Sequence, residues 1–135
     1  MRDPDCLFCK IIAGELPSQQ VDSDERTVAF MDISPATRGH ALVVPRNHVV
    51  NVLDADPGDF AAVAAAAQRL AQRAVERLGA DGINLLTSGG GVAWQTVFHL
   101  HMHVIPRYVD DPLKLPWVPS PGDAGEIAAT AELLR

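Results

Sequence analysis

The sequence predicts an α+β fold in one domain, and three observations support this prediction. Several apolar segments resemble strands, and the connections among the later ones are short enough for antiparallel pairing. One long alanine-rich segment has the periodicity of an amphipathic helix. With 135 residues, 47% of them hydrophobic, the chain can bury a real core and is too apolar to be disordered. We therefore expect an antiparallel sheet of about five strands, one long helix and short terminal helices.

The N-terminal part of the chain predicts one short helix followed by strands. Residues 6–14 carry apolar side chains at the spacing of a short amphipathic helix, which Gly14 can end. Apolar segments that predict strands follow at residues 21–24, 27–31 and 40–44. Pro45 ends the last of these strands.

A long helix is predicted over residues 57–78. Asp56 is a good N-terminal cap, Pro57 suits the first helical position, and Gly79 suits a C-terminal stop. Apolar residues recur every three or four positions, which gives the helix one face that can pack on a sheet. That face consists of Phe60, Val63, Ala67, Leu70, Ala74 and Leu78.

The second half of the chain predicts two more strands and an irregular tail. The strands lie at residues 83–87 and 97–105, and the glycine-rich turn 88–91 follows the first of them. Prolines at positions 112, 116, 119 and 121 exclude regular structure from most of the tail. A last short helix is expected at 123–134.

Three of the five histidines stand at alternate positions: His99, His101 and His103. Side chains alternate between the faces of a strand, so this spacing predicts that all three imidazoles share one face. Imidazole titrates near neutral pH and can act as acid, base, nucleophile or metal ligand. Packing alone does not account for such a row, which is therefore the first candidate for a functional site.

Composition and charge exclude several classes of partner. The formal net charge is −6 and the 11 Lys and Arg residues form no basic run, so a nucleic acid polymer is not expected. No apolar stretch approaches the roughly 20 residues that span a bilayer, and no signal segment is visible. We expect a cytoplasmic protein without membrane contact, in which Cys6 and Cys9 form a metal or redox site.

The histidine row resembles the signature of the histidine triad (HIT) family, in which three histidines alternate with apolar residues. Further segments are similar to blocks of that family, in the same order. They are residues 6–18, 29–35, 39–48, 95–99 and 105–107. Several blocks in one order are more specific than any single motif. On this resemblance, residues 1–135 form a single HIT domain with a motif-bearing core at 6–107 and a proline-rich tail at 108–135.

The resemblance implies a HIT-like fold, a homodimer and a purine mononucleotide of the AMP or GMP type as ligand. The implied reaction is hydrolysis of the bond between a nucleotide α-phosphate and a leaving group. Nucleoside phosphoramidates and dinucleoside polyphosphates contain such bonds. Histidine at the third triad position favours the hydrolase branches over the nucleotidyltransferase branch. We expect the helix 57–78 and the strand 83–87 to pair in the dimer.

The functional residues of the family carry over position by position. His101 matches the nucleophile, which forms a covalent nucleotidyl-histidine intermediate, and His103 matches a contact to the α-phosphate. Thr96 matches a hydroxyl near the leaving atom or a phosphate oxygen, His99 completes the catalytic row, and Asp32 matches the ribose contact. Further nucleotide-binding candidates are Leu7, Phe8, Ile11, Phe30, Ile33 and Leu42 around the base, together with Ser88 and Gln95 near the phosphates.

Four positions match the ligands of a structural zinc site in bacterial relatives. They are Cys6, Cys9, His48 and His99. Two thiolates and two imidazoles form a saturated tetrahedral set, so this zinc would be structural and no catalytic metal is required. It would hold the N-terminal helix against the sheet and orient the first histidine of the row.

Two positions depart from the family pattern. Ser88 stands where many members have asparagine or glutamine, and Trp94 stands where glycine is usual. A bulky indole beside the phosphate loop narrows the leaving-group side or changes the loop conformation, and therefore bears on the range of substrates.

Two other functions are compatible with the sequence. In one, His99, His101 and His103 ligate a catalytic zinc that keeps an open position for water. In the other, the same pocket belongs to a non-catalytic, regulatory nucleotide-binding dimer. Metal content separates the first from the covalent mechanism, and turnover by a His101 variant separates the second.

Overall fold

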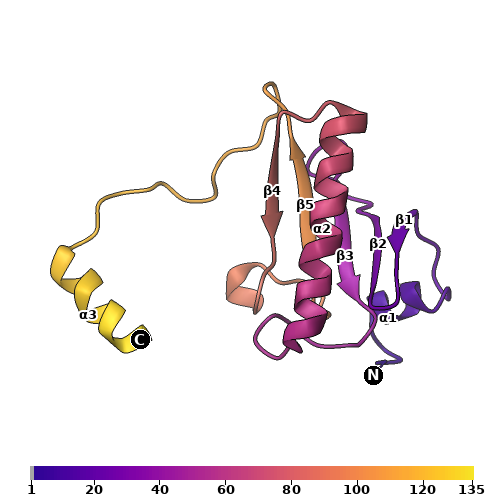
Figure 1. The fold of residues 1–135 in the computed structure, drawn as a ribbon, viewed down its shortest axis with the longest axis horizontal. Coiled ribbons are helices and arrows are strands. Elements are labelled where there is room, and N and C mark those ends of the chain that lie inside the picture. The colour runs from indigo at the N-terminus through magenta and orange to yellow at the C-terminus, as the bar shows by residue number, and fades with distance from the viewer. Residues whose placement is uncertain (1) are drawn as a thin grey trace.

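The protein is a five-stranded antiparallel sheet with one long helix across one face, as a computed structural model describes for residues 2–135 (Figure 1). The helices are α1 (Leu7–Ile12), α2 (Pro57–Leu78) and α3 (Ala124–Leu134), and a 3-10 turn, η1, covers Gly91–Ala93. The strands are β1 (Gln20–Ser23), β2 (Thr27–Met31), β3 (Ala41–Pro45), β4 (Gly82–Leu86) and β5 (Met102–Arg107). They lie in the order β1-β2-β3-β5-β4. The predicted fold class is confirmed.

Helix α2 begins and ends at the predicted residues because both of its ends are capped. The Asp56 carboxylate accepts a hydrogen bond of 3.0 Å from the Asp59 backbone N–H, and Pro57 occupies the first turn. At the other end, Gly79 has φ +71° and its N–H donates to the Ala74 carbonyl. Arg26, just before β2, donates to Asp59 at 2.7 Å and ties the start of the helix to the sheet.

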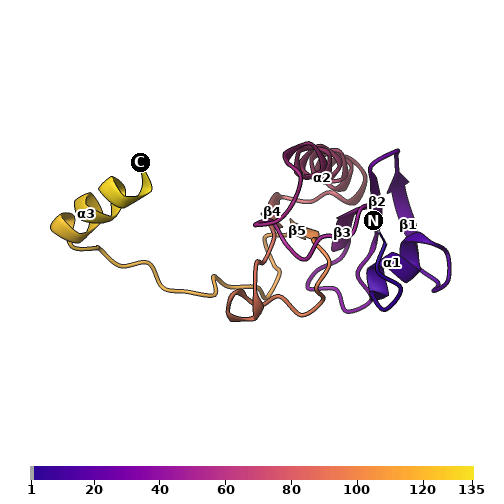
Figure 2. The ribbon, with the colours of Figure 1, turned by 90° about the horizontal axis from the view of Figure 1, so that it is seen from below.

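The sheet separates two apolar layers. Figure 2 shows the sheet from below, with α2 on one face and α1 on the other. The layer under α2 contains Val43, Met102 and Val104 from the sheet and Val63 and Leu70 from the helix. The layer under α1 consists of Phe8, Ile11, Val28, Phe30, Leu42 and Val44. Side chains alternate along β3, so neighbouring residues of this strand support opposite layers.

The strand predicted at 97–105 is wrong in its bounds, because β5 covers only Met102–Arg107. The residues before it are held by loops instead: the Leu100 N–H donates to the Val49 carbonyl at 2.8 Å, and the Gln95 amide donates to the Val50 carbonyl at 2.6 Å. His99 and His101 therefore precede the strand. Their imidazoles still lie on the same side as that of His103, because the rings of His99 and His101 contact Phe8 of α1 and the ring of His101 contacts that of His103.

The tail leaves the body of the protein beyond β5. Figures 1 and 2 both show α3 standing apart from the sheet at the end of an extended segment. The helix lies within the predicted range 123–134, the Asp123 carboxylate caps it, and none of its residues is buried. Within residues 2–135, no helix is long and apolar enough to cross a membrane.

Candidate active site

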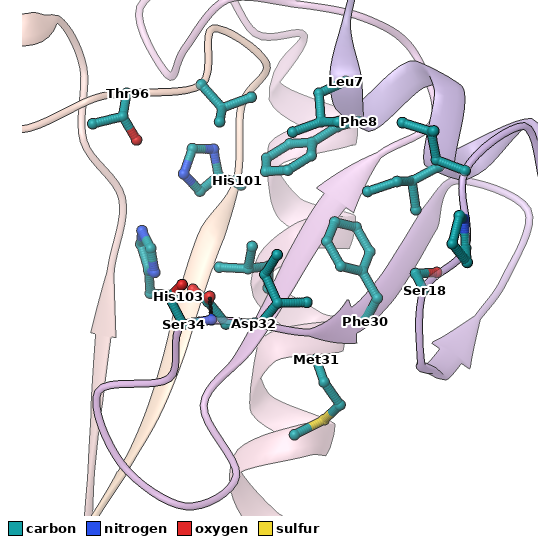
Figure 3. A pocket seen from close by; sticks show the side chains of 16 residues that line it. Leu7, Phe8, Ser18, Phe30, Met31, Asp32, Ser34, Thr96, His101 and His103 are labelled. Carbon is teal, nitrogen blue, oxygen red and sulfur yellow. Dashed lines mark hydrogen bonds between the residues drawn. The ribbon is translucent and has the colours of Figure 1, made fainter.

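A cavity of about 500 Å³ lies on the α1 side of the sheet, and two histidines of the row line it (Figure 3). Its apolar wall comes from α1, β2 and β3, whereas His101, His103 and Thr96 form the polar side. The lining consists of Leu7, Phe8, Ile11, Leu16, Pro17, Ser18, Phe30, Met31, Asp32, Ile33, Ser34, Leu42, Thr96, Val97, His101 and His103. An apolar pocket with a few convergent polar groups is the usual form of a small-molecule site.

The structure brings most of the predicted nucleotide-binding residues to this cavity. All of the base and ribose candidates line it, as do Thr96, His101 and His103. Ser88 and Gln95 do not. Gln95 is 4% exposed, and its amide accepts from the Gly90 N–H at 2.8 Å and donates to the Val50 and Val97 carbonyls. Through its bond to Gly90, the Gln95 side chain orders the glycine-rich turn 88–91.

His101 is held by the backbone so that one ring nitrogen remains available. Its Nδ1 lies 2.7 Å from the carbonyl oxygen of His99. A carbonyl can only accept, so Nδ1 carries the hydrogen and the neutral ring has its lone pair on Nε2. Burial lowers the pKa of His101 and keeps the ring neutral. The edge of Phe8 packs on the ring with centroids 5.1 Å apart.

His103 stands beside His101, with ring centroids 5.0 Å apart. It pairs with Leu42 of β3 on one side and Leu86 of β4 on the other, so the sheet fixes its position. Burial, together with the neighbouring His101 and His40, lowers the pKa of His103 to about 4. The ring is therefore neutral near pH 7.

A fourth histidine, His40, lies behind this pair, and the sequence analysis did not single it out. Its Nε2 is 2.9 Å from Nδ1 of His103 and 3.5 Å from a carboxylate oxygen of Asp32. It immediately precedes β3 and is 5% exposed. Only its position opposite β5 reveals its relation to the site. The sequence analysis also missed six residues of the wall, namely Leu16, Pro17, Ser18, Met31, Ser34 and Val97.

The four predicted metal ligands converge on one point beside the cavity. One donor atom of each of Cys6, Cys9, His48 and His99 lies within 4.8 Å of all the others. Nδ1 of His99 is 3.4 Å from Sγ of Cys6 and 3.5 Å from Sγ of Cys9, and the two histidine Nδ1 atoms are 3.1 Å apart. These separations are close to the edges, about 3.3–3.6 Å, of a tetrahedron with zinc-ligand bond lengths.

His99 is oriented toward this cluster by the backbone. Its Nε2 lies 2.8 Å from the Pro45 carbonyl and must donate to it, which leaves the lone pair on Nδ1, facing the two sulfur atoms. Metal-bound histidines commonly donate their other ring N–H in this way. The donor set and its orientation fit a structural zinc ion.

The glycine loop beside the cavity contains a strained residue. Trp94 follows η1 with φ +76°, the single positive φ outside glycine in the described part of the chain. Left-handed backbone favours glycine, which the family resemblance also leads one to expect at this position. The indole is 56% exposed. Trp94 therefore strains the loop and presents a large apolar surface on it.

Comparisons with known proteins agree with this architecture. The family model for the HIT domain matches residues 13–110. The crystal structure of SMU.412c from Streptococcus mutans UA159 superposes with a TM-score of 0.92 at 39% identity, over 98% of this chain and 84% of that one. A zinc-bound histidine triad family protein from Mycobacterium smegmatis superposes with a TM-score of 0.79 at 42% identity, over 96% and 95% of the two chains.

One relative carries a named activity. The adenylylsulfatase HINT3 of Arabidopsis thaliana is 36% identical over 103 residues, which are 76% of this chain and 52% of that protein. The similarity therefore covers about half of the plant protein.

Proposed function

The chain belongs to the HIT family of nucleotide-binding proteins and hydrolases, and on this premise we propose that it hydrolyses a purine nucleotide at the α-phosphate through a nucleotidyl-His101 intermediate. The observation that carries the proposal is the hydrogen bond from His101 Nδ1 to the His99 carbonyl, beside a cavity of about 500 Å³. Substrates of this class are nucleoside phosphoramidates and dinucleoside polyphosphates, and the plant relative adds adenylyl sulfate.

The reaction proceeds in two displacements. The Nε2 lone pair of His101 forms a bond to the α-phosphorus while the bond to the leaving group breaks, and the leaving group departs with the electron pair and takes up a proton from solvent. The ring becomes cationic, and the His99 carbonyl stabilises it through Nδ1–H. Water then attacks the phosphorus while the bond to Nε2 of His101 breaks, and the water gives up a proton to solvent. This step releases the nucleoside monophosphate and restores the neutral ring.

The other residues of the cavity have complementary roles. His103 donates to a non-bridging oxygen of the α-phosphate, and Thr96 bonds to the leaving atom or a phosphate oxygen. Phe8, Phe30 and the other apolar residues surround the base. Asp32 accepts from the ribose hydroxyls, because its carboxylate keeps acceptor capacity after bonding the Ser34 N–H at 2.8 Å.

We also propose that zinc binds the cluster of Cys6, Cys9, His48 and His99 as a structural ion. Within residues 2–135, no cluster of metal-ligating side chains contains His101. Because Nδ1 of His99 faces the cysteines and Nδ1 of His103 faces His40, the free nitrogens of the row do not converge on one ion. This geometry favours the covalent mechanism over a catalytic zinc held by the three histidines.

The homodimer and a cytoplasmic location remain parts of the proposal. Val75 on α2 and Leu85 on β4, an edge strand, are 50% and 47% exposed, which suits pairing along this edge. Cys6 and Cys9 form no disulfide, which leaves both sulfur atoms available to a zinc ion. Reduced cysteines are typical of a reducing compartment.

Turnover of a purine nucleoside phosphoramidate, followed by chromatography, tests the proposal. We expect wild-type protein to release the nucleoside monophosphate and His101→Ala to lose at least about 10³-fold in kcat/KM, since no nucleophile remains. AMP binding, measured by calorimetry, should persist in the variant. Acid-quenched wild-type protein should show a nucleotidyl adduct on His101 by mass spectrometry. Equal turnover in the variant contradicts the mechanism, and AMP binding without turnover in the wild type supports the regulatory alternative.

A further inference from the structure

His40 lies directly behind His103 and does not itself line the cavity. The two rings are tilted by 46° with centroids 5.1 Å apart, and Nε2 of His40 is 2.9 Å from Nδ1 of His103. Two facing imidazole nitrogens can form a hydrogen bond only if one carries the hydrogen and the other does not. The question is therefore which ring donates.

A backbone contact to the other ring nitrogen of His40 decides which ring donates. The N–H of Ala36 donates to Nδ1 of His40 at 2.9 Å, and a backbone N–H can only donate. Nδ1 of His40 must accept, so the neutral ring carries its hydrogen on Nε2. That N–H points to His103, whose Nδ1 must accept in turn.

The remaining nitrogen of His103 follows from this chain of bonds. With Nδ1 accepting, the neutral ring carries its hydrogen on Nε2, on the side of the ring away from His40. Figure 3 shows His103 at the cavity, beside Asp32 and below His101. We infer that His40 is a positioning residue: it holds His103 in the Nε2–H form, so that the cavity receives a fixed N–H donor. Only the identity of the acceptor, an α-phosphate oxygen, rests on the proposed function.

A metal ion is the competing explanation, because Asp32, His40 and His103 bring three possible ligand atoms within 4.8 Å of one another. An ion bound to Nε2 of His40 would require the hydrogen on Nδ1, where it would meet the N–H of Ala36 head-on. The hydrogen-bonded chain satisfies every one of these groups without an ion. The cluster is therefore a relay of hydrogen bonds.

Two substitutions distinguish the effect of the hydrogen-bond donor of His40 from the effect of its volume. In His40→Gln the side-chain amide reaches the position of Nε2 and can still donate to His103, whereas His40→Met fills the space with no donor. We expect His40→Met to lower kcat about 100-fold, the usual cost of a lost transition-state donor, and His40→Gln to lower it less than about tenfold. KM should change little in either variant. Thr37→Val is the matched control, because it removes a buried hydrogen bond to the Pro106 carbonyl in the same loop and leaves the relay intact.

The decisive measurement is the ring protonation of His103 by ¹⁵N NMR of histidine-labelled protein, with its signals assigned by their loss in His103→Gln. Wild-type protein and Thr37→Val should show hydrogen on Nε2 and an unprotonated Nδ1. His40→Met should shift signal toward the Nδ1–H form.

The inference is overturned if wild-type His103 carries its hydrogen on Nδ1, a result that needs no variant to fold. It is also overturned if folded His40→Met keeps the wild-type pattern, or if Gln and Met at position 40 lower kcat equally. If no substrate is turned over but the NMR pattern is as expected, the proposed function fails and the role of His40 stands.

Discussion

The three histidines of the row differ in which ring nitrogen carries the hydrogen. The Pro45 carbonyl holds it on Nε2 in His99, the His99 carbonyl holds it on Nδ1 in His101, and His40 accounts for Nε2 in His103. Identical side chains thereby become a candidate ligand, a candidate nucleophile and a candidate donor. The difference lies entirely in the partners of each ring, because the intrinsic chemistry of imidazole is the same.

Buried His103 predicts that stability falls in acid. Its pKa is lowered to about 4 by burial and by His101 and His40, whereas an unfolded histidine titrates near 6.5. Between these values the unfolded chain binds a proton that the folded chain excludes, so the free energy of unfolding decreases as pH falls below 6.5. For His103 this decrease is about 2 kcal/mol between pH 6.5 and 4.5.

Urea denaturation of wild-type protein and His103→Gln at these two pH values, with excess zinc, measures the effect. The variant should lose less stability than the wild type. An equal loss in the two proteins would show that His103 is not the group responsible.

At the residue scale, the sequence predicted which side chains meet but not how they are held. The alternation of His99, His101 and His103 was visible, as was the carboxylate at Asp32. The carbonyl partners and the role of His40 were not, because they depend on contacts between segments such as β3 and β5. Gln95 shows the same limit: the sequence predicted that it lies near the phosphates, whereas its side chain is buried and bonds the backbone of Gly90, Val50 and Val97.

Helix α1 has six residues, too few to be stable by itself, and a zinc ion bound to Cys6 and Cys9, as proposed, would anchor it. We predict that Cys9→Ser reduces bound zinc from one ion per chain to nearly none and lowers the thermal midpoint. At free zinc 100 times Kd, binding contributes about 2.7 kcal/mol. Metal analysis and thermal denaturation with and without chelator measure both effects.

His101→Asn is the control for this experiment and should keep its zinc. If Cys9→Ser retains zinc while His101→Asn loses it, the metal belongs to the reaction centre and the structural site is wrong.

Helix α2 depends on a left-handed residue at its end. A Cβ on Gly79 would meet nothing within 4 Å, so the cost of Gly79→Ala comes only from φ +71°. We expect the free energy of unfolding to fall by about 1 kcal/mol. Gly91→Ala is the matched control, since its Cβ also meets open space and its φ is not positive. Urea denaturation that finds the two variants equally stable would contradict this reasoning.

At the element scale, local signals were sufficient for some segments and misleading for one. The bounds of α2 follow from Asp56, Pro57 and Gly79, which act on neighbouring residues. The predicted strand at 97–105 failed because apolar alternation does not reveal the hydrogen bond between Leu100 and Val49, which draws the backbone away from the sheet. A pattern read from neighbouring residues does not show that a residue far away in the sequence, here Val49, takes up a backbone hydrogen bond that the strand would need.

The whole molecule consists of a packed body and an exposed arm. Both apolar layers belong to the body, whereas α3 contributes no buried residue. The fold class, sheet and long helix could be predicted because they follow from periodicity within segments. The separation of the arm could not, since proline content excludes regular structure without saying where the chain goes.

The dimer is predicted to form along the edge that contains β4. Leu85 pairs with Val104, so it faces the same side as α2 and the exposed Val75. Leu85→Lys should shift sedimenting dimer toward monomer at micromolar protein, because it places a charge in the predicted apolar contact. Leu53→Lys, at a loop residue that is 83% exposed, should have no effect. A wild-type protein that sediments as a monomer would refute the dimer.

The two tryptophans of the chain are both outside the apolar layers: Trp94 in the strained loop and Trp117 in the arm, 56% and 59% exposed. Intrinsic fluorescence of this protein therefore reports on the loop that contains Trp94 and on the arm rather than on the interior. Emission typical of water-exposed indoles is expected even from the intact native state. A change in that emission on adding a nucleotide would report a change in the surroundings of Trp94 or Trp117 rather than in the two apolar layers.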